Sequence, residues 1–293
     1  MQYINTTASA LPTLTYAYSV DAETSLPTPN ITCLDSSTLR IRNVVSNPGM
    51  LYEILAHVDA PDGTVACTPL SSSGPSNATL TVTGGSKAWM TWVGETDYSM
   101  ETGNAASNYS FQGTDPHSNL VALLYSTAIS TQSYTSILEE HITDYSSLVN
   151  KFSLSLGQTP NFQTPTDKLV SSYRTHFGNP YLEWLLFNYG RYLLVCSARS
   201  TLPANLQGIW ANGLTNAWGS GKILCRFVNA IDDRSLHQII VSALASDTSP
   251  MLNLLLDSNV NIQMNYWFAE MTNLDVSHSL FNYFEVKNFP LRY

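Results

Sequence analysis

Alternating apolar and polar residues dominate the first third of the chain. They form short runs separated by segments rich in Pro, Gly, Asn and Ser; the clearest runs are Thr38–Arg42, Leu51–Leu55, Thr79–Val82 and Lys87–Val93. Alternation with a period of two predicts half-buried strands, and the residues between the runs predict tight turns. A spacing of about ten residues between runs is typical of a sandwich. We therefore expect residues 1–113 to form a β-sandwich.

The pattern becomes helical after residue 113. Asp115-Pro116 is typical of a helix start, and Leu120, Leu123 and Leu124 then share one apolar face. The residues from Tyr134 to Leu148 predict a second helix. We expect residues 114–164 to form a helical linker that follows the sandwich.

A third helical region begins at residue 165. Pro165 and Pro180 follow Thr164 and Asn179, which predicts two helices with a proline in the first turn and a side-chain cap before it. In the second of these helices, apolar residues recur at helical spacing: Leu182, Leu185, Leu186, Tyr189, Leu193 and Cys196. We expect this stripe to lie in the core and Cys196 to be a buried thiol.

Composition and charge exclude several classes of partner. The chain has 293 residues, of which 12% are charged, and a net charge of −9. A negative charge of this size argues against nucleic acid and anionic membranes as partners. No apolar run approaches the roughly 18 residues of a membrane span, and no signal peptide is visible at the N-terminus. The six histidines are scattered without metal-ligand spacing, so we expect neither a metal nor another cofactor.

The first 110 residues contain four Asn-x-Ser/Thr tripeptides, which begin at Asn5, Asn30, Asn77 and Asn108. These could arise by chance in a segment rich in Ser and Thr, or they could mark a secreted glycoprotein. Cys33 and Cys67 lie in the same segment and could pair, although their spacing does not fix the connectivity.

Two later stretches combine carboxamides and aromatic rings with almost no charge. Residues 202–210 read Leu-Pro-Ala-Asn-Leu-Gln-Gly-Ile-Trp, and residues 259–267 read Asn-Val-Asn-Ile-Gln-Met-Asn-Tyr-Trp. Carboxamides offer a donor and an acceptor to a hydroxyl group, while Trp and Tyr offer flat apolar area with a polar edge. These stretches therefore predict a site for a neutral, hydroxyl-rich ligand with apolar ring faces, which is the chemistry of a sugar.

At these residues the chain resembles the α-L-fucosidases of glycoside hydrolase family 95. Shorter matches at 188–194, 216–219 and 269–274 support the resemblance, which extends from about Pro48 to about Glu285. The resemblance implies a multidomain β + α protein: a β-domain, a helical linker and an (α/α)6 barrel. We therefore expect residues 165–293 to contain the first helices of an incomplete barrel.

The resemblance also implies a reaction, the hydrolysis of terminal α-linked L-fucose from glycans with inversion. In this family a Glu donates a proton to the leaving oxygen, and an Asp, helped by two asparagines, activates water. Asn259 and Asn261 match those asparagines, although helix capping is an alternative role for them. The Glu and the Asp belong to later barrel segments that this chain lacks, so we expect the chain itself to be an inactive fragment. Glu270 is expected to be a structural hydrogen-bonding residue rather than a replacement.

The resemblance and the residue types together give a set of candidate substrate-binding residues: Asn205, Gln207, Trp210, Trp218, Gln263 and Trp267. Trp210 and Trp218 could instead be core residues, and Asn205 and Gln207 could simply hold a loop. The expected partner is a fucosylated oligosaccharide or glycan. A different hexose, such as L-galactose, is one alternative, and a non-catalytic carbohydrate-binding or structural secreted glycoprotein is another.

The chain departs from the family pattern at two places. Residues 221–256 form an atypical insert, after which Asp257 stands where the family has His; a second departure follows Glu285. Retained introns would explain both departures. A surface loop is the alternative for the first, because a long insertion costs little closure entropy.

Overall fold

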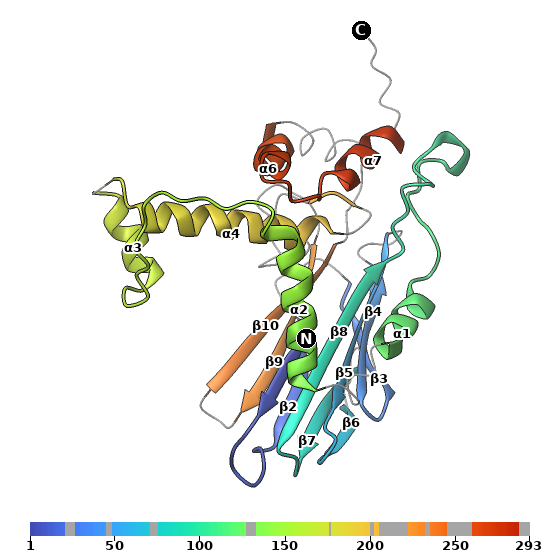
Figure 1. The fold of residues 1–293 in the computed structure, drawn as a ribbon. Helices are drawn as coiled ribbons and strands as arrows, with labels where there is room; N and C mark the ends of the chain where they lie inside the picture. The colour runs from blue at the N-terminus through green and yellow to red at the C-terminus, as the bar shows by residue number, and fades with distance from the viewer. Residues whose placement is uncertain are drawn as a thin grey trace. The chain divides into compact units, whose positions relative to one another are not determined.

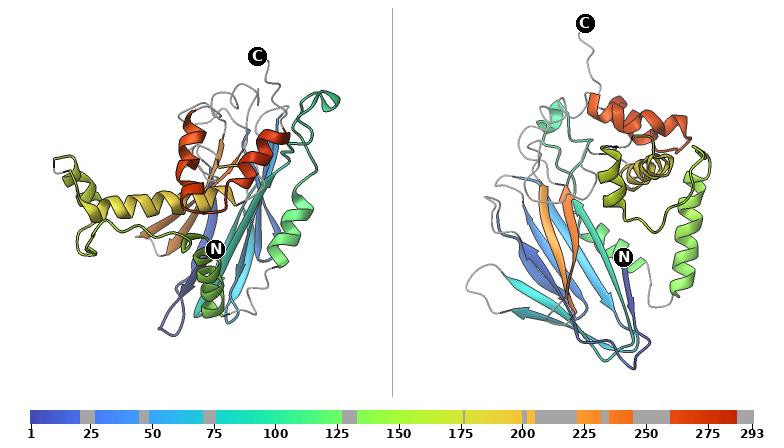
Figure 2. Two further views of the ribbon diagram at one scale, coloured as in Figure 1. Left: turned by 45° about the horizontal axis from the view of Figure 1, so that its top comes forward. Right: turned by 90° about the vertical axis from the view of Figure 1, so that its left-hand side faces the viewer.

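A computed structural model describes residues 1–20, 27–44, 49–70, 76–126, 133–175, 177–199, 202–204, 222–231, 235–244 and 260–286. The chain divides into two compact units (Figures 1 and 2). The first comprises Met1–Ile137 and Ile209–Leu255, and the second comprises Leu138–Gly208 and Leu256–Tyr293.

The first unit contains two five-stranded antiparallel sheets. One has the order β1-β8-β5-β4-β3 and the other the order β10-β9-β2-β7-β6 (Figure 1). The strands are β1 (Gln2–Asn5), β2 (Leu14–Val20), β3 (Asn30–Asp35), β4 (Thr38–Val44), β5 (Leu51–Asp59), β6 (Thr64–Leu70), β7 (Asn77–Thr83), β8 (Lys87–Thr96), β9 (Lys222–Ile231) and β10 (Ser235–Leu244).

Alternate residues of both sheets form one hydrophobic core, as the period-two pattern predicts. Leu39 and Ile54 come from one sheet, Tyr16 and Leu80 from the other, and all four are buried in the same cluster. A disulfide between Cys33 and Cys67 joins β3 to β6, each of which is an edge strand of its sheet. The sandwich-like arrangement is thus confirmed, and the structure contains the cysteine pairing that the sequence left open.

The atypical insert contains two strands in this structure. β9 and β10 pair with each other, and β9 also pairs with β2 from Leu14↔Ile231 to Val20↔Cys225. The backbone of this hairpin therefore finds hydrogen-bond partners by extending a sheet of the first unit, although its residues lie within the range 165–293 that sequence reasoning assigned to the barrel.

Helix α1 (His117–Ser126) covers the outer face of the first sheet. Leu120 and Leu124 pack on Leu55 of β5, which buries this strand on both faces instead of one. Leu123, which sequence reasoning placed on the same apolar face, is half exposed. The expectation for Leu123 is wrong because α1 contacts the sheet through Leu120 and Leu124, and this contact does not extend to the whole apolar face of the helix.

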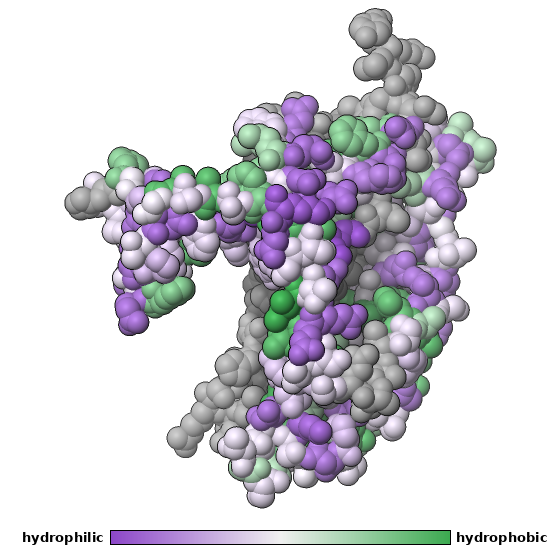
Figure 3. Space-filling view, in the orientation of Figure 1, coloured by the Kyte–Doolittle hydropathy of each residue, from purple (hydrophilic) through white to green (hydrophobic). Residues whose placement is uncertain are grey.

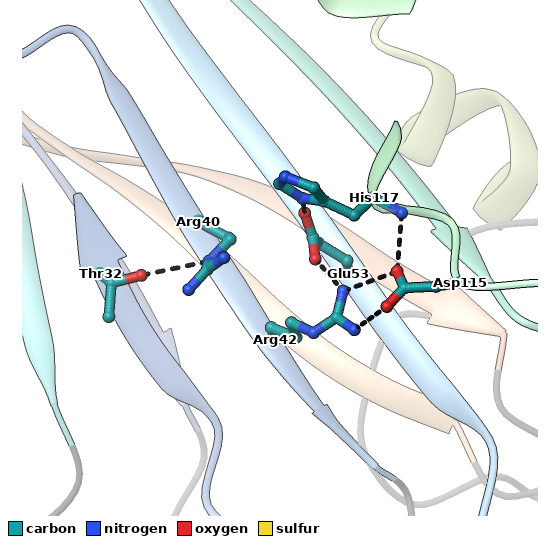
Figure 4. A network of polar contacts seen from close by, with 6 residues as sticks. All are labelled: Thr32, Arg40, Arg42, Glu53, Asp115 and His117. Atoms are coloured by element: carbon teal, nitrogen blue, oxygen red, sulfur yellow. Dashed lines mark hydrogen bonds and ion pairs between the residues drawn. The ribbon is translucent and has the colours of Figure 1, made fainter. Parts of the chain in front are cut away.

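Charged side chains attach the start of α1 to the sheet (Figure 4). Glu53 of β5 is completely buried; it accepts a bond from Arg42 of β4 and lies 2.6 Å from Nδ1 of His117. Arg42 also pairs with Asp115, whose Oδ1 accepts the backbone N–H of His117 at 2.9 Å. The Arg42 bond, together with this N–H bond, lowers the pKa of Asp115 to about 2.

A second polar cluster holds the end of the same helix. The hydroxyl of Tyr125 donates to Asp35, and the Thr38 hydroxyl lies 3.0 Å from Asp35 Oδ2 and 2.9 Å from Nδ1 of His57. Burial lowers the pKa of His57, which favours its neutral form. The first helix of the predicted linker is therefore an integral part of the sandwich unit.

The remaining helices are α2 (Tyr134–Val149), α3 (Thr166–Tyr173), α4 (Pro180–Ala198), α6 (Val260–Met271) and α7 (His278–Val286), and a short 3-10 turn, η1, spans Ala105–Ser107. The predicted helix from Tyr134 is confirmed, as is the cap at Asn179, whose side chain accepts the N–H of Leu182 at 3.0 Å. The prediction for Pro165 is wrong: this residue precedes α3 with an extended ψ of 143° and does not lie in its first turn.

The core of the second unit uses a different face of α4 from the one that the sequence suggests. Leu194, Val195 and Ala198 are buried against residues of α6 and α7. Leu182 is buried, as the predicted core stripe requires, and Leu185 is partly buried. Leu186, Tyr189 and Leu193 are about half exposed and Cys196 is an exposed thiol, so the rest of the stripe and the buried cysteine were predicted wrongly. Hydrophobic patches accordingly lie along α4 in Figure 3.

Candidate functional site

The two carboxamide-aromatic stretches meet in the second unit. The backbone N–H of Ala204, in the first stretch, donates to the hydroxyl of Tyr266, in the second, at 2.7 Å. Both residues are buried in the same cluster, and burial raises the pKa of Tyr266, so its hydroxyl stays protonated at neutral pH. This bond brings together two segments that lie about sixty residues apart in the sequence.

Helix α6 has a buried face and an exposed face. Tyr266 and Ala269 lie in the core, whereas Gln263 and Met264 are exposed and 63% of Trp267 is accessible to solvent. Residues four apart lie on the same side of a helix, so Gln263 and Trp267 are neighbours on the exposed face. An indole held by the helix and bordered by a carboxamide is a suitable surface for a sugar ring.

The structure places only part of the predicted site. Gln263 and Trp267 lie together on α6, and the backbone of Asn261 lies in the first turn of this helix. The side chain of Asn261 is outside the described part of the chain. So are five other predicted residues: Asn205, Gln207, Trp210, Trp218 and Asn259.

The stretch after Trp267 ends helix α6. Asn273 has a left-handed φ of 52°. Its N–H donates to the carbonyl of Glu270 at 3.1 Å, and the N–H of Leu274 donates to the carbonyl of Ala269 at 3.0 Å. This pair of bonds is a Schellman motif, and Leu274 and Ala269 are both buried, as the motif requires. The carboxylate of Glu270 is exposed, so only the backbone of this residue has the structural hydrogen-bonding role that we expected.

Replacing Asn273 with Ala is expected to lower the free energy of unfolding by about 1 to 2 kcal/mol, because a left-handed backbone costs Ala more than Asn. Replacing it with Gly should leave stability unchanged or raise it. Urea unfolding of the two variants checks this, and equal losses for both would show that the side chain, not the backbone, matters.

Arg191 of α4 is a buried cation. Its guanidinium donates to the Val149 carbonyl at 2.8 Å and to Asn188 Oδ1 at 3.3 Å, and it lies over the ring of Phe152. A cation at the last carbonyls of α2 stabilises the end of that helix. Glu183, earlier on the same helix, accepts from the Tyr173 hydroxyl at 2.6 Å. Arg191 and Tyr266 thus organise the unit, and motif spacing alone did not identify them.

The described residues around α6 supply binding groups and no proton-transfer pair. Glu270 is exposed, and the carboxylate of Asp275, also exposed, has Lys151 as a distant partner at 3.9 Å. Among the described residues there is no group of three metal-ligating side chains. What the described geometry offers chemically is therefore recognition of a neutral ligand.

Comparison with known proteins finds one matching family and several similar sequences. Residues 133–224 match the Glycosyl hydrolase family 95 catalytic domain, and this match ends close to Gly221, where the atypical insert begins. Probable alpha-fucosidase A of Aspergillus niger is 30% identical over 280 residues, which are 94% of this chain and 30% of the relative.

Two further relatives extend this comparison. Probable alpha-fucosidase A of Aspergillus oryzae is 31% identical over 298 residues, covering 98% of this chain and 34% of the relative. Alpha-L-fucosidase 2 of Arabidopsis thaliana is 33% identical over 158 residues, covering 52% of this chain and 15% of the relative. The chain spans about a third of the length of the two fungal relatives. The chain is thus similar, over residues 133–224, to the catalytic domain of glycosyl hydrolase family 95, and along most of its length to two proteins named probable alpha-fucosidase A.

Proposed function

We propose that this chain is part of an α-L-fucosidase that hydrolyses terminal α-linked L-fucose from glycans with inversion, and that α6 forms one wall of the sugar site. The observation that carries this proposal is the exposed pair of Gln263 and Trp267, in a chain similar along most of its length to proteins named α-fucosidases. The proposed substrate is a fucosylated oligosaccharide, and neither nucleic acid nor a membrane is a proposed partner.

The exposed pair suits the two kinds of surface that L-fucose presents. Its C–H groups and methyl form an apolar patch that can stack on the indole of Trp267, while its hydroxyls can exchange hydrogen bonds with a carboxamide such as that of Gln263. A charged side chain would bring no advantage with a neutral ligand. In the same proposal Asn205, Gln207, Trp210 and Trp218 complete the binding surface.

Hydrolysis with inversion requires more groups than this helix supplies. Water attacks the anomeric carbon on the face opposite to the leaving oxygen, one carboxylate removes a proton from the water, and one carboxylic acid protonates the leaving oxygen. In our proposal Asn259 and Asn261 orient the water, because a carboxamide is too weak a base to activate it alone. The acid Glu and the base Asp come from the part of the relatives' sequence that this chain does not include. No metal takes part in this mechanism.

The domain arrangement and location of the protein follow from the same proposal. Helices α3 to α7 would be the first helices of an (α/α)6 barrel, preceded by the linker over residues 114–164. We propose that the protein is secreted, which agrees with the disulfide between Cys33 and Cys67, since such bonds persist in oxidising compartments. No helix in the described part of the chain is long and apolar enough to cross a membrane.

Replacing Trp267 with Ala is expected to weaken L-fucose binding about fivefold or more, because the loss of a stacking ring costs about 1 kcal/mol or more. Met271→Ala is the matched control: Met271 is exposed at the end of the same helix, and its thioether offers no ring for stacking. Titration of each variant with L-fucose, followed by nuclear magnetic resonance, gives the Kd of each variant. Equal weakening in the two variants would argue against a stacking role for Trp267.

Turnover distinguishes the proposed function from its alternative. The 293-residue chain should bind L-fucose but leave a nitrophenyl α-L-fucoside intact, because both proton-transfer carboxylates are missing and groups that act as a unit fail together. The same chain extended with the remaining sequence of a fungal relative should regain hydrolysis. Binding without any activity in the extended protein would instead favour a non-catalytic carbohydrate-binding glycoprotein.

A further inference from the structure

The loop between β8 and α1 is a braced projection that carries the tripeptide Asn108-Tyr109-Ser110. The N–H of Ser99 bonds to the carbonyl of Phe111 at 2.8 Å, and the rings of Tyr98 and Phe111 stack with centroids 6.0 Å apart. In Figures 1 and 2 this loop extends beyond the end of its sheet. The tip therefore has a defined shape and stands away from the sheet surface.

Asn108 is an exposed residue of this loop. It follows the turn η1, its φ of 51° and ψ of 30° are left-handed, and its N–H bonds to the carbonyl of Ala105 at 3.2 Å. Asn adopts this conformation more readily than most residues. Within the described part of the chain its side chain has no hydrogen-bond partner, so the amide nitrogen is available for modification.

The other three tripeptides differ in how well they expose the amide. Asn5 and Asn30 are exposed, on the edge strands β1 and β3. Asn77 is half-buried on β7, which lies between β2 and β6 in its sheet. A glycan is bulky and hydrated, so a folded protein accommodates it where the amide nitrogen faces water.

We propose that the folded protein carries N-linked glycans at Asn5, Asn30 and Asn108 and none at Asn77. In this reaction the amide nitrogen of Asn forms a bond to the anomeric carbon of a lipid-linked oligosaccharide, the bond from that carbon to the lipid pyrophosphate breaks, and the amide loses one proton. The Cys33–Cys67 disulfide agrees with the proposed secretion, because such bonds persist in oxidising compartments. The proposal rests on the secretion included in the proposed function and is independent of fucosidase activity.

The test is to secrete the full 293-residue chain from a eukaryotic host behind an added signal peptide and to remove its glycans with peptide N-glycosidase in heavy-oxygen water. Each occupied Asn becomes a labelled Asp that peptide mass spectrometry locates. We expect complete or nearly complete labelling at Asn5, Asn30 and Asn108 and none at Asn77. If the cells do not release the chain, the same peptide analysis is applied to the soluble protein inside the secretory compartments. The same labelling pattern is expected there.

Variants at the hydroxyl position provide matched controls. Ser110→Ala should abolish labelling at Asn108 while leaving Asn108 itself unchanged, and Ser110→Thr should preserve it; Thr79→Ala should change nothing. Absence of label at Asn108, or labelling of Asn77 to the same extent, would overturn the proposal. No fucoside enters the experiment, so its failure leaves the proposed activity untouched, and loss of that activity would not alter the labelling pattern.

Discussion

Replacing Arg42 with Met is expected to lower the free energy of unfolding by about 3 to 5 kcal/mol, the range measured when one partner of a buried ion pair is removed. Arg42 is the link between the completely buried Glu53 and the exposed Asp115 (Figure 4). Without it, the Glu53 carboxylate remains in the protein with His117 as its remaining partner among the described residues. Urea unfolding, monitored by circular dichroism, measures the loss.

Two variants separate charge burial from simple loss of a side chain. In Arg42→Met/Glu53→Met both charges are gone, and we expect most of the lost stability to return, to within about 1 kcal/mol of the original protein. Arg40→Met is the matched control on the same strand: Arg40 donates to the Thr32 hydroxyl at 3.3 Å and has no ion pair among the described residues, so its loss should cost less than about 1 kcal/mol. Equal losses for Arg40→Met and Arg42→Met would contradict this account of the cluster.

Removing the disulfide is expected to have the second large effect. The bond between Cys33 and Cys67 closes a loop with a sequence separation of 34 residues, for which the loss of unfolded-state entropy amounts to about 3 to 4 kcal/mol. The double variant Cys33→Ser/Cys67→Ser should therefore unfold at clearly lower urea concentration than the oxidised protein. Reducing agent should produce a similar loss in the unmodified protein and no further loss in the variant.

Cys196→Ser is the control for that measurement. Its thiol is exposed on α4, so the substitution should change stability by less than about 0.5 kcal/mol. A double variant as stable as the oxidised protein would show that hydrophobic burial alone holds β3 and β6 together.

The sandwich could be predicted well because its residues alternate with period two and its turns contain turn-forming residues. The start of α4 was equally clear, since Asn179 and Pro180 form a local capping pattern. The buried face of α4 could not be predicted in the same way. Its apolar residues surround much of the helix, and only the positions of α2 and α6 decide that Leu194 rather than Leu193 is buried.

In the candidate site, too, local sequence predicts which residue types are suited to bind a ligand but not which distant segments come into contact. Residue type predicted Gln263 and Trp267 as ligand-facing, and the structure places both on the exposed side of α6. The bond between Ala204 and Tyr266 joins two distant segments, and no local pattern contains that pairing. The same holds for Arg191, whose partner at the end of α2 lies 42 residues away.

The most direct test of the proposed sugar site compares L-fucose with its mirror image, D-fucose, in titrations of the 293-residue chain followed through the Trp267 indole resonance. The two sugars have identical polarity and size, so nonspecific effects are the same for both. We predict saturable shifts with L-fucose, with a Kd on the order of millimolar for so small a ligand, and no comparable shifts with D-fucose. Equal shifts with both sugars, or none with L-fucose, would contradict the assignment of α6 to an L-fucose site.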